Sequence, residues 1–153
     1  MALIKKENLN ELLNRLEGKK IVFTNGCFDI LHIGHVKYLK ESKKFGDILI
    51  VGLNSDSSVK KLKGENRPIN NEIDRAGVLD ELKSVDYVVI FSEDTPVELL
   101  DIIKPDVYTK GADYTLETLP EAQTVMKNGG RVEFISFVEG KSTTNVVKNI
   151  LSN

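Results

Sequence analysis

The sequence of 153 residues contains a single cysteine, which excludes an internal disulfide bond. A lone thiol fits a reducing compartment such as the cytosol. There is also no excess of basic residues, since 21 lysines and arginines are set against 23 aspartates and glutamates, for a net charge of −2. General nucleic-acid binders and membrane-surface binders normally carry a basic excess, so neither class is favoured. Any anion must therefore be held by a local cluster of side chains.

Long apolar runs are missing as well. Residues 1–15 lack the apolar stretch of a signal peptide, and no segment approaches the length that spans a membrane. We therefore expect a cytoplasmic protein with no membrane partner and no nucleic-acid partner. The chain has no internal repeat and no low-complexity linker. Its length suits one domain that buries roughly 70% of the surface of the unfolded chain.

Two common phosphate-binding motifs are absent. No G-x-G-x-x-G follows the first expected strand, so an NAD-type site is not expected. Residues 140–142 (Gly-Lys-Ser) look like the end of a P-loop, but that motif needs a glycine at position 135, which is isoleucine. Ser142, Thr143 and Thr144 can still cap a helix and offer hydroxyl and N–H groups to a polyphosphate. A plain helix cap is the alternative for these three residues.

Buried-strand patterns and amphipathic helical patterns alternate along the chain. This alternation is typical of an α/β fold, and we expect a single Rossmann-like domain with a five-stranded parallel sheet and helices on both faces. The expected strands are residues 20–24, 47–53, 86–91, 106–109 and 131–137. The expected helices are residues 9–16, 34–45, 73–82 and 96–104, one that ends near 128–130, and one that starts near 142. An N-terminal helix within residues 1–19 would precede a catalytic core of residues 20–151.

The tetrad His32-Ile33-Gly34-His35 follows the first strand and its turn, and it opens the second expected helix. Two imidazoles three residues apart lie on one helical face, near unpaired backbone N–H groups and the positive end of the helix dipole. Gly34 lets a ligand approach the backbone closely. The combination predicts a phosphate site. The alternatives are polar surface or a metal site with Cys27 and Asp29, although a structural zinc site usually has paired ligands on both sides of a loop.

Polar residues follow four of the expected strands. Ligands of open parallel sheets bind beyond the carboxyl ends of the strands, where the strand order reverses, so we expect these residues to converge on a ligand at one edge of the sheet. The expected ligand-binding residues are Thr24 at the end of the first strand and Asn25, Gly26, Cys27, Phe28 and Asp29 after it; Asn54 and Asp56 after the second; Lys110, Gly111, Asp113 and Tyr114 after the fourth; and residues 139–144 after the fifth.

A basic segment follows the second strand. It contains Lys60, Lys61, Lys63 and Arg67, with Arg75 further along the chain. The glycine and proline within residues 60–68 indicate a mobile loop that leads into a helix. Loop lysines that close over a nucleotide can neutralise its triphosphate. The alternative is a solvated charged loop without a function.

Residues 27–35 (Cys-Phe-Asp-Ile-Leu-His-Ile-Gly-His) resemble the HxGH signature of the nucleotidyltransferase superfamily, and residues 140–144 resemble its second, C-terminal signature. Six further segments make the chain resemble the D-glycero-β-D-manno-heptose 1-phosphate adenylyltransferases more closely. They are residues 51–56, 62–64, 67–70, 85–89, 93–96 and 110–114. The resemblance spans residues 20–151. The chain departs from this family at Ala112, where glycine is more usual, and at Lys141, where a small residue or cysteine is more usual.

The resemblance implies an enzyme that transfers AMP from ATP to heptose 1-phosphate, giving ADP-heptose for lipopolysaccharide core synthesis and releasing pyrophosphate. It implies that His32 and His35 bind phosphates and stabilise charge, with Lys63 and Arg67 assisting, and that residues 142–144 hold the β- and γ-phosphates. Residues 110–114 would contact adenosine. Mg²⁺ would arrive with ATP, and Asp29 would assist through the metal or by orienting His32.

The resemblance also implies a homodimer and a separate sugar kinase that supplies the sugar 1-phosphate. Two alternatives stay open. One is a cytidylyltransferase acting on glycerol 3-phosphate or a similar alcohol phosphate, whose second signature usually carries an arginine that residues 137–141 lack. The other is a non-catalytic nucleotide-binding module.

Overall fold

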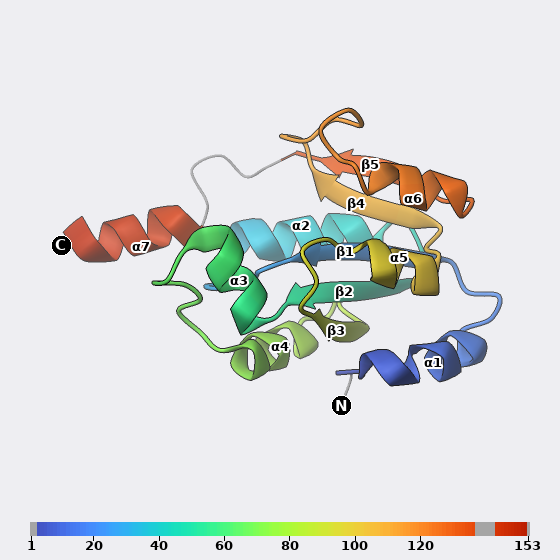
Figure 1. The fold of residues 1–153 in the computed structure, drawn as a ribbon, viewed down its shortest axis with the longest axis horizontal. Helices are drawn as coiled ribbons and strands as arrows, with labels where there is room; N and C mark the ends of the chain where they lie inside the picture. The colour runs from blue at the N-terminus through green and yellow to red at the C-terminus, as the bar shows by residue number, and fades with distance from the viewer. Residues whose placement is uncertain (1–2, 137–142, 153) are drawn as a thin grey trace.

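A parallel sheet of five strands forms the centre of the molecule, in the order β3-β2-β1-β4-β5 (Figure 1). The computed structural model describes residues 3–136 and 143–152. The strands are β1 (Ile21–Gly26), β2 (Ile48–Asn54), β3 (Tyr87–Phe91), β4 (Val107–Gly111) and β5 (Arg131–Ile135). The predicted fold class and all five predicted strands are confirmed, with strand ends displaced by a few residues.

The strand order reverses beside β1. The chain proceeds from β1 to β2 and β3 on one side, and β4 then returns to pair with the other side of β1. The register joins Thr24 to Val51 in β2 and Phe23 to Tyr108 in β4. Because β1 lies between the two halves of the sheet, a crevice opens beyond its carboxyl end.

Seven α-helices and one short 3-10 helix, η1 (Lys6–Asn8), surround the sheet in the described residues. The α-helices are α1 (Leu9–Arg15), α2 (Ile33–Lys43), α3 (Asp56–Lys63), α4 (Glu72–Asp80), α5 (Val97–Ile103), α6 (Ala122–Lys127) and α7 (Thr143–Ser152). Within residues 3–136 and 143–152, none of them combines the length and the apolar character needed to cross a bilayer.

The prediction of a mobile loop from Lys60 onward is wrong for residues 60–63, which belong to α3. The Ser55 hydroxyl caps this helix by accepting the Ser58 N–H at 3.3 Å. Val59 is fully buried and anchors the helix to the core. Gly64 ends it with a φ of 104°, a conformation that side-chain-bearing residues rarely adopt. The basic segment therefore begins on a rigid element.

Helices cover both faces of the sheet (Figure 1). Successive side chains of a strand point to opposite faces, so Phe23 packs with α1, α5 and α6, whereas Val22 packs with α2 and α4. Both side chains are fully buried, and burying a side chain of this size contributes roughly 1.5–3 kcal/mol. The two cores hold α2 and the carboxyl ends of the strands in a fixed relation.

Candidate active site

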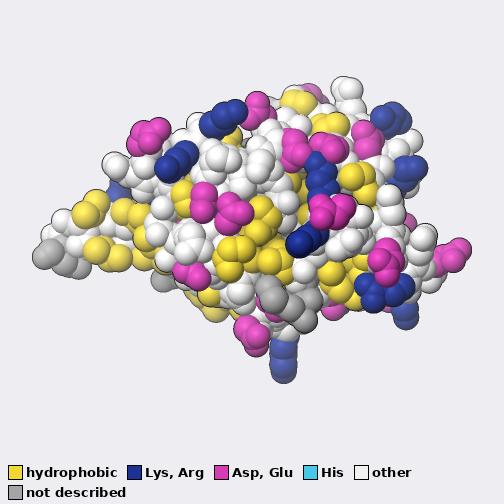
Figure 2. Space-filling model, turned by 60° about the horizontal axis from the view of Figure 1, so that its bottom comes forward, with side chains coloured by type: hydrophobic (Ala, Val, Ile, Leu, Met, Phe, Trp, Pro, Cys, Tyr) yellow, Lys and Arg dark blue, Asp and Glu magenta, His cyan; other side chains and the backbone are white. Residues whose placement is uncertain are grey.

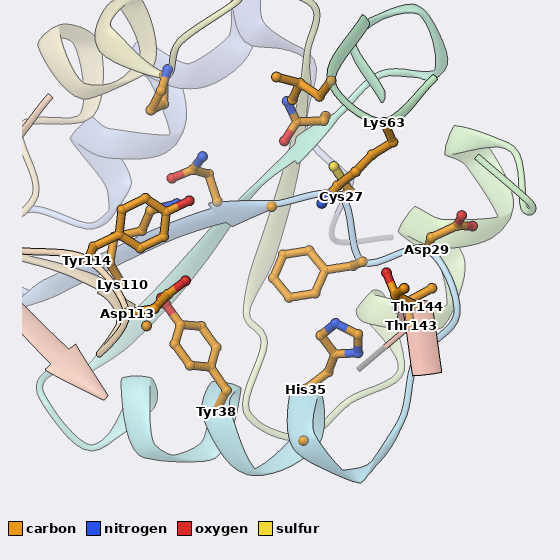
Figure 3. A pocket seen from close by; sticks show the side chains of 18 of the residues that line it. Cys27, Asp29, His35, Tyr38, Lys63, Lys110, Asp113, Tyr114, Thr143 and Thr144 are labelled. Carbon is orange, nitrogen blue, oxygen red and sulfur yellow. The ribbon is translucent and has the colours of Figure 1, made fainter. Parts of the chain in front are cut away.

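A cavity of about 610 Å³ opens beyond the carboxyl ends of the strands, at the reversal beside β1. His35 and Tyr38 point into it from α2, and Lys63 approaches from the opposite wall (Figure 3). Thr143 and Thr144 lie at one end of the cavity, and Lys110, Asp113 and Tyr114 lie at the other end. A cavity of this size suits a small-molecule ligand.

Most of the residues expected from the sequence to bind a ligand do line this cavity. They are Asn25, Gly26, Cys27, Phe28, Asp29, His32, Gly34, His35, Asn54, Lys63, Arg67, Lys110, Gly111, Asp113, Tyr114, Thr143 and Thr144. Ser142 lies outside the described residues. The structure thus brings segments that follow different strands together around one cavity, as predicted.

Three expected ligand-binding residues, Thr24, Asp56 and Arg75, do not line the cavity. The Arg75 side chain is fully buried and donates to the carbonyl oxygens of Cys27 at 2.7 Å and Asn54 at 2.8 Å. It also donates to the Asp56 carboxylate at 2.9 Å. Arg75 therefore joins the ends of β1 and β2 from a buried position outside the cavity lining. It supports the site, and the prediction that it contacts a nucleotide is wrong in this structure.

Thr24 has a similar supporting position at the end of β1. It is fully buried, and its hydroxyl donates to the Thr109 carbonyl oxygen at 3.0 Å. The Tyr38 hydroxyl lies 2.8 Å from the same Thr24 oxygen. Thr24 thus supports a cavity-lining side chain instead of contacting a ligand itself.

The two histidines cap α2 rather than both lying within its first turn. His32 is the N-cap residue, and its Nδ1 accepts the Gly34 N–H at 3.1 Å. The His35 Nδ1 accepts the His32 N–H at 3.3 Å. The Gly34 N–H is therefore already occupied, contrary to the expectation of unpaired N–H groups at this end. Because each Nδ1 is an acceptor, the neutral rings carry their protons on Nε2.

The environment of His35 keeps its imidazole neutral at pH 7. Burial, together with the nearby His32 imidazole, lowers the pKa of His35 from 6.5 to about 4. The two ring centroids are 4.0 Å apart, and the Phe28 ring lies 5.5 Å from that of His35. Phe28 itself holds a φ of 45°, an uncommon backbone conformation that clusters at functional sites. An anion at this end of the cavity would favour the protonated ring.

Asp29 fixes the segment of residues 67–70 at the edge of the cavity. Its carboxylate accepts hydrogen bonds from Arg67 Nε at 3.0 Å, the Ile69 N–H at 2.8 Å and the Asn70 N–H at 2.9 Å. Burial raises the pKa of the Asp29 carboxyl, but these donors outweigh it, so the pKa lies below its ordinary value. The carboxylate stays charged and holds Arg67 in place.

Cationic side chains face the cavity although the whole chain is slightly acidic. Lys63 and Arg67 line one wall, and Lys110 lies at the other end with its ammonium 4.9 Å from the centre of the Tyr114 ring. Burial lowers the pKa of Lys110, while Glu121 and Asp113 act in the opposite direction. A chain with a net charge of −2 needs a local cluster of cations to hold an anion, and these three side chains form such a cluster.

Sequence reasoning missed several residues that line the cavity. They are Tyr38, Leu62, Phe91, Asp94, Thr95, Pro96, Glu121 and Ser136. The spacing of Tyr38, three residues after His35 on the same helical face, was a usable signal. Glu121 carries no comparable signal, because its place depends on how α6 packs beside β4.

Metal-binding groups do not cluster in the part of the chain that the structure describes. No set of three histidine, cysteine, aspartate or glutamate residues is arranged there to hold a metal ion. The alternative of a metal site on Cys27, Asp29 and the two histidines therefore has no geometric support.

The comparisons with known proteins agree on one family. The family described as cytidylyltransferase-like matches residues 23–148. The bifunctional protein HldE of Aliarcobacter butzleri is 57% identical over 151 residues, which cover 96% of this chain and 30% of that protein. The bifunctional protein HldE of Geobacter metallireducens is 54% identical over 152 residues, covering 96% and 31%. This chain thus spans about a third of the length of these relatives.

Two solved structures share the fold. The lipopolysaccharide core biosynthesis protein of Thermoplasma volcanium is 35% identical, with a TM-score of 0.66, and the match covers 81% of this chain and 100% of that one. The pantoate-β-alanine ligase of Francisella tularensis is 17% identical, with a TM-score of 0.65, and the match covers 100% of this chain and 80% of that one. The latter likeness concerns the fold alone.

Proposed function

This chain belongs to the cytidylyltransferase-like family, and on that premise we propose that it is an adenylyltransferase acting on a sugar 1-phosphate. The proposed reaction joins ATP and D-glycero-β-D-manno-heptose 1-phosphate to give ADP-heptose and pyrophosphate. The observation that carries the proposal is the pair of imidazoles at the start of α2, which shares one cavity with Thr143 and Thr144 at the start of α7. The sugar and the pathway follow from the resemblance of the sequence and from the lipopolysaccharide core protein that shares the fold.

The reaction needs no nucleophile from the protein. A phosphate oxygen of the sugar 1-phosphate attacks the α-phosphorus of ATP, and the bond between that phosphorus and the oxygen bridging to the β-phosphorus breaks. Pyrophosphate leaves opposite the attacking oxygen, so positioning and charge stabilisation supply the acceleration. The Nε2–H groups of His32 and His35 would donate to the α-phosphoryl oxygens and the leaving group.

The other walls of the cavity have complementary roles. The Thr144 hydroxyl and backbone N–H groups at the start of α7 would hold the β- and γ-phosphates. Lys63 and Arg67 would neutralise charge from the opposite side, with Arg67 positioned by Asp29. Lys110, Asp113 and Tyr114 would contact the nucleoside.

Mg²⁺ fits this site as a companion of ATP. The Asp29 carboxylate is occupied by Arg67 and two backbone N–H groups, and Asp56 is paired with Arg75. We therefore propose that the ion is held mainly by triphosphate oxygens, where it would neutralise charge on the departing pyrophosphate. Asp29 then acts on Arg67 instead of on the metal.

The reaction also implies partners. A sugar 1-phosphate is the product of phosphorylation, so a sugar kinase activity must supply the acceptor. We further propose a homodimer formed through α7, because Ile150 is 65% exposed and Leu151 is 80% exposed on this helix. Hydrophobic side chains gather on the protruding end of the molecule that α7 forms (Figures 1 and 2). An ATP-dependent reaction fits the cytoplasmic location expected from the sequence.

Pyrophosphate release tests the function directly. ATP or CTP would be combined with heptose 1-phosphate, with other sugar 1-phosphates and with glycerol 3-phosphate. We expect release from ATP with the heptose compound at a rate well above that for the other pairs. Release from CTP with glycerol 3-phosphate would instead identify a cytidylyltransferase. ATP binding without release from any pair would identify a nucleotide-binding module.

A further inference from the structure

A buried tyrosine links two cavity-lining side chains that the proposed reaction does not use. Tyr108 lies in β4 and is fully buried. Its hydroxyl donates to Asn25 Oδ1 and also reaches Glu121 Oε1 at 3.2 Å. Asn25 and Glu121 both line the cavity, from the end of β1 and from the N-cap position of α6. These three residues are called the Tyr108 cluster below.

In the Tyr108 cluster, one phenol proton faces two acceptors, the amide oxygen of Asn25 and the carboxylate of Glu121. Burial, with a contribution from Glu121, raises the pKa of Tyr108 well above its ordinary value, so the phenol keeps its one proton. That proton can serve either Asn25 or Glu121 fully, but not both. If it serves Asn25, the Glu121 carboxylate lacks a donor from the tyrosine. If the proton serves Glu121, the side-chain amide of Asn25 can rotate by half a turn and donate an N–H to the phenol oxygen. The amide oxygen of Asn25 then points away from Tyr108.

Either arrangement leaves an acceptor oxygen available at the cavity wall. A ligand that donates a hydrogen bond gives this acceptor oxygen a partner. An apolar ligand would remove the oxygen from water without giving it a partner, which costs binding free energy. Lys110 lies close enough to Glu121 for its pKa to respond to that carboxylate. Acceptors beside a cationic donor match a pair of neighbouring hydroxyl groups, because each hydroxyl both donates and accepts.

The geometry points to a sugar-hydroxyl subsite at the Tyr108 cluster, in which Glu121 and Asn25 accept from a ring diol and Tyr108 is the positioning residue. The inference rests on the proposed function, since that reaction brings two sugar rings into the cavity, the ribose of ATP and the acceptor sugar. Both present the same diol chemistry. The subsite therefore determines which hydroxyl pattern the protein accepts on one of these rings.

Binding measurements with and without single hydroxyls test this subsite. Calorimetry would compare ATP with 2′-deoxy-ATP and 3′-deoxy-ATP, and heptose 1-phosphate with sugar 1-phosphates that differ at one hydroxyl. A hydrogen bond to a charged acceptor is worth enough to give a preference of about ten- to a hundred-fold for the complete ligand. We expect that preference in one of the two ligand series. The series that shows it identifies the ring.

Variants connect the preference to the Tyr108 cluster. In Glu121→Ala the preference should fall to about one at the hydroxyl whose proton Glu121 accepts, because that hydroxyl has lost its acceptor. Glu121→Gln should restore part of this preference. Tyr108→Phe should reduce the preference while the variant stays folded, which a merely structural role would not do. Glu117→Ala, an exposed carboxylate in the preceding turn, and Tyr87→Phe on β3 are the matched controls and should keep the preference of the unchanged protein.

The outcomes separate this inference from the proposed function. A wild-type protein with no preference in either series, or a Glu121→Ala variant in which no preference falls, overturns the subsite while leaving pyrophosphate release intact. Failure to release pyrophosphate from any pair, with the preference present and lost in Glu121→Ala, overturns the function and supports the subsite. If neither ATP nor any sugar 1-phosphate binds, both are overturned.

Discussion

His35 shows how one side chain combines structural and chemical roles. Its Nδ1 caps the start of α2 by accepting the His32 N–H, so the opposite ring nitrogen carries a proton into the cavity. Burial holds the pKa of the ring at about 4, and the ring is therefore an uncharged donor until an anion arrives. Such a preorganised donor needs little rearrangement when charge develops on a reacting phosphate.

Replacement of His35 by alanine should lower kcat by about 10²- to 10³-fold, the scale seen when one preorganised charge-stabilising donor is removed. The measurement is steady-state pyrophosphate release under saturating ATP. Lys40→Ala, an exposed position on the same helix, is the control and should keep the wild-type rate. A wild-type rate in His35→Ala would refute the assignment of the phosphate site.

The depressed pKa of His35 also predicts a pH dependence of stability. Below pH 6.5, the ordinary pKa of histidine, His35 is protonated in the unfolded chain, whereas in the folded protein it stays neutral until the pH reaches about 4. The free energy of unfolding should therefore fall as the pH drops from 6.5 to 4. In His35→Gln, whose amide can still cap the helix, this part of the loss should be absent.

Urea unfolding of both proteins at several pH values between 7 and 4 measures this difference. The low pKa of Asp29 affects stability only as the pH falls toward and below the ordinary carboxyl value of 3.8, so the two contributions occupy different pH ranges. Stability curves that run parallel for wild type and His35→Gln across the whole range would contradict the assignment.

At the scale of elements, α3 and the segment of residues 64–71 form the cationic wall of the cavity. Ser55 and Val59 fix α3, and Asp29 fixes the segment through Arg67, Ile69 and Asn70. The side chain of Asp29 is only 2% exposed and that of Arg67 is 16% exposed, so their ion pair is shielded from solvent. The wall is thus built by local capping together with one long-range ion pair.

Lys63→Ala should weaken ATP binding and lower turnover, because it removes a cation that lines the cavity. The expected loss is about ten-fold in kcat/KM, in keeping with roughly 1.5 kcal/mol for a hydrogen bond to a charged group. Lys60→Ala is the matched control, since Lys60 lies on the same helix, is exposed and does not line the cavity. If Lys63→Ala and Lys60→Ala showed the same kcat/KM and the same ATP affinity, the basic segment would be a solvated charged surface without a role in the reaction.

Asp29→Asn should loosen the attachment of residues 67–70. An amide offers only one acceptor oxygen, whereas the carboxylate receives three donors on its two oxygens, so we expect a loss of about 1–3 kcal/mol in stability. Hydrogen exchange of the Ile69 and Asn70 amides should accelerate more than exchange in the strands. Unchanged exchange at those two amides would show that the segment is held by other contacts.

At the scale of the whole molecule, the order of the strands decides where the site lies. Because β4 returns beside β1, the ends of β1, β2 and β4 and the starts of α2 and α7 meet around one cavity. α7 enters this assembly through the Thr143 hydroxyl, which donates to the Ile30 carbonyl oxygen at 3.0 Å. Its exposed apolar side chains at the other end remain available to a second copy of the chain.

The double variant Ile150→Glu, Leu151→Glu should shift a dimer toward monomer. Each buried side chain of this size contributes roughly 1.5–3 kcal/mol, so association should weaken by at least about ten-fold. Sedimentation velocity over a range of concentrations measures the change, with Lys148→Glu on the same helix as the control. A wild-type protein that stays monomeric, or a double variant that dimerises as well as wild type, would contradict the proposed interface.

The sequence by itself determined the class of fold and most of the site. Alternation of apolar strands and amphipathic helices leaves few arrangements other than a parallel sheet with helices on both faces, and residues after parallel strands must gather at one edge. His32, His35 and Lys110 can therefore be identified as site residues from the sequence alone. The helix that carries Lys63 is not predictable in this way, because its apolar side is short and its lysines dominate the pattern.

Only the tertiary structure decided which polar residue faces the cavity and which supports it from behind. Arg75 and Arg67 are equally plausible phosphate ligands by type and position along the chain, yet Arg75 is buried under the strand ends and Arg67 lines the cavity. Tyr108 and Glu121 meet Asn25 only because α6 packs beside β4. These relations depend on contacts between distant segments, and local periodicity fixes the face of an element without fixing what packs against it.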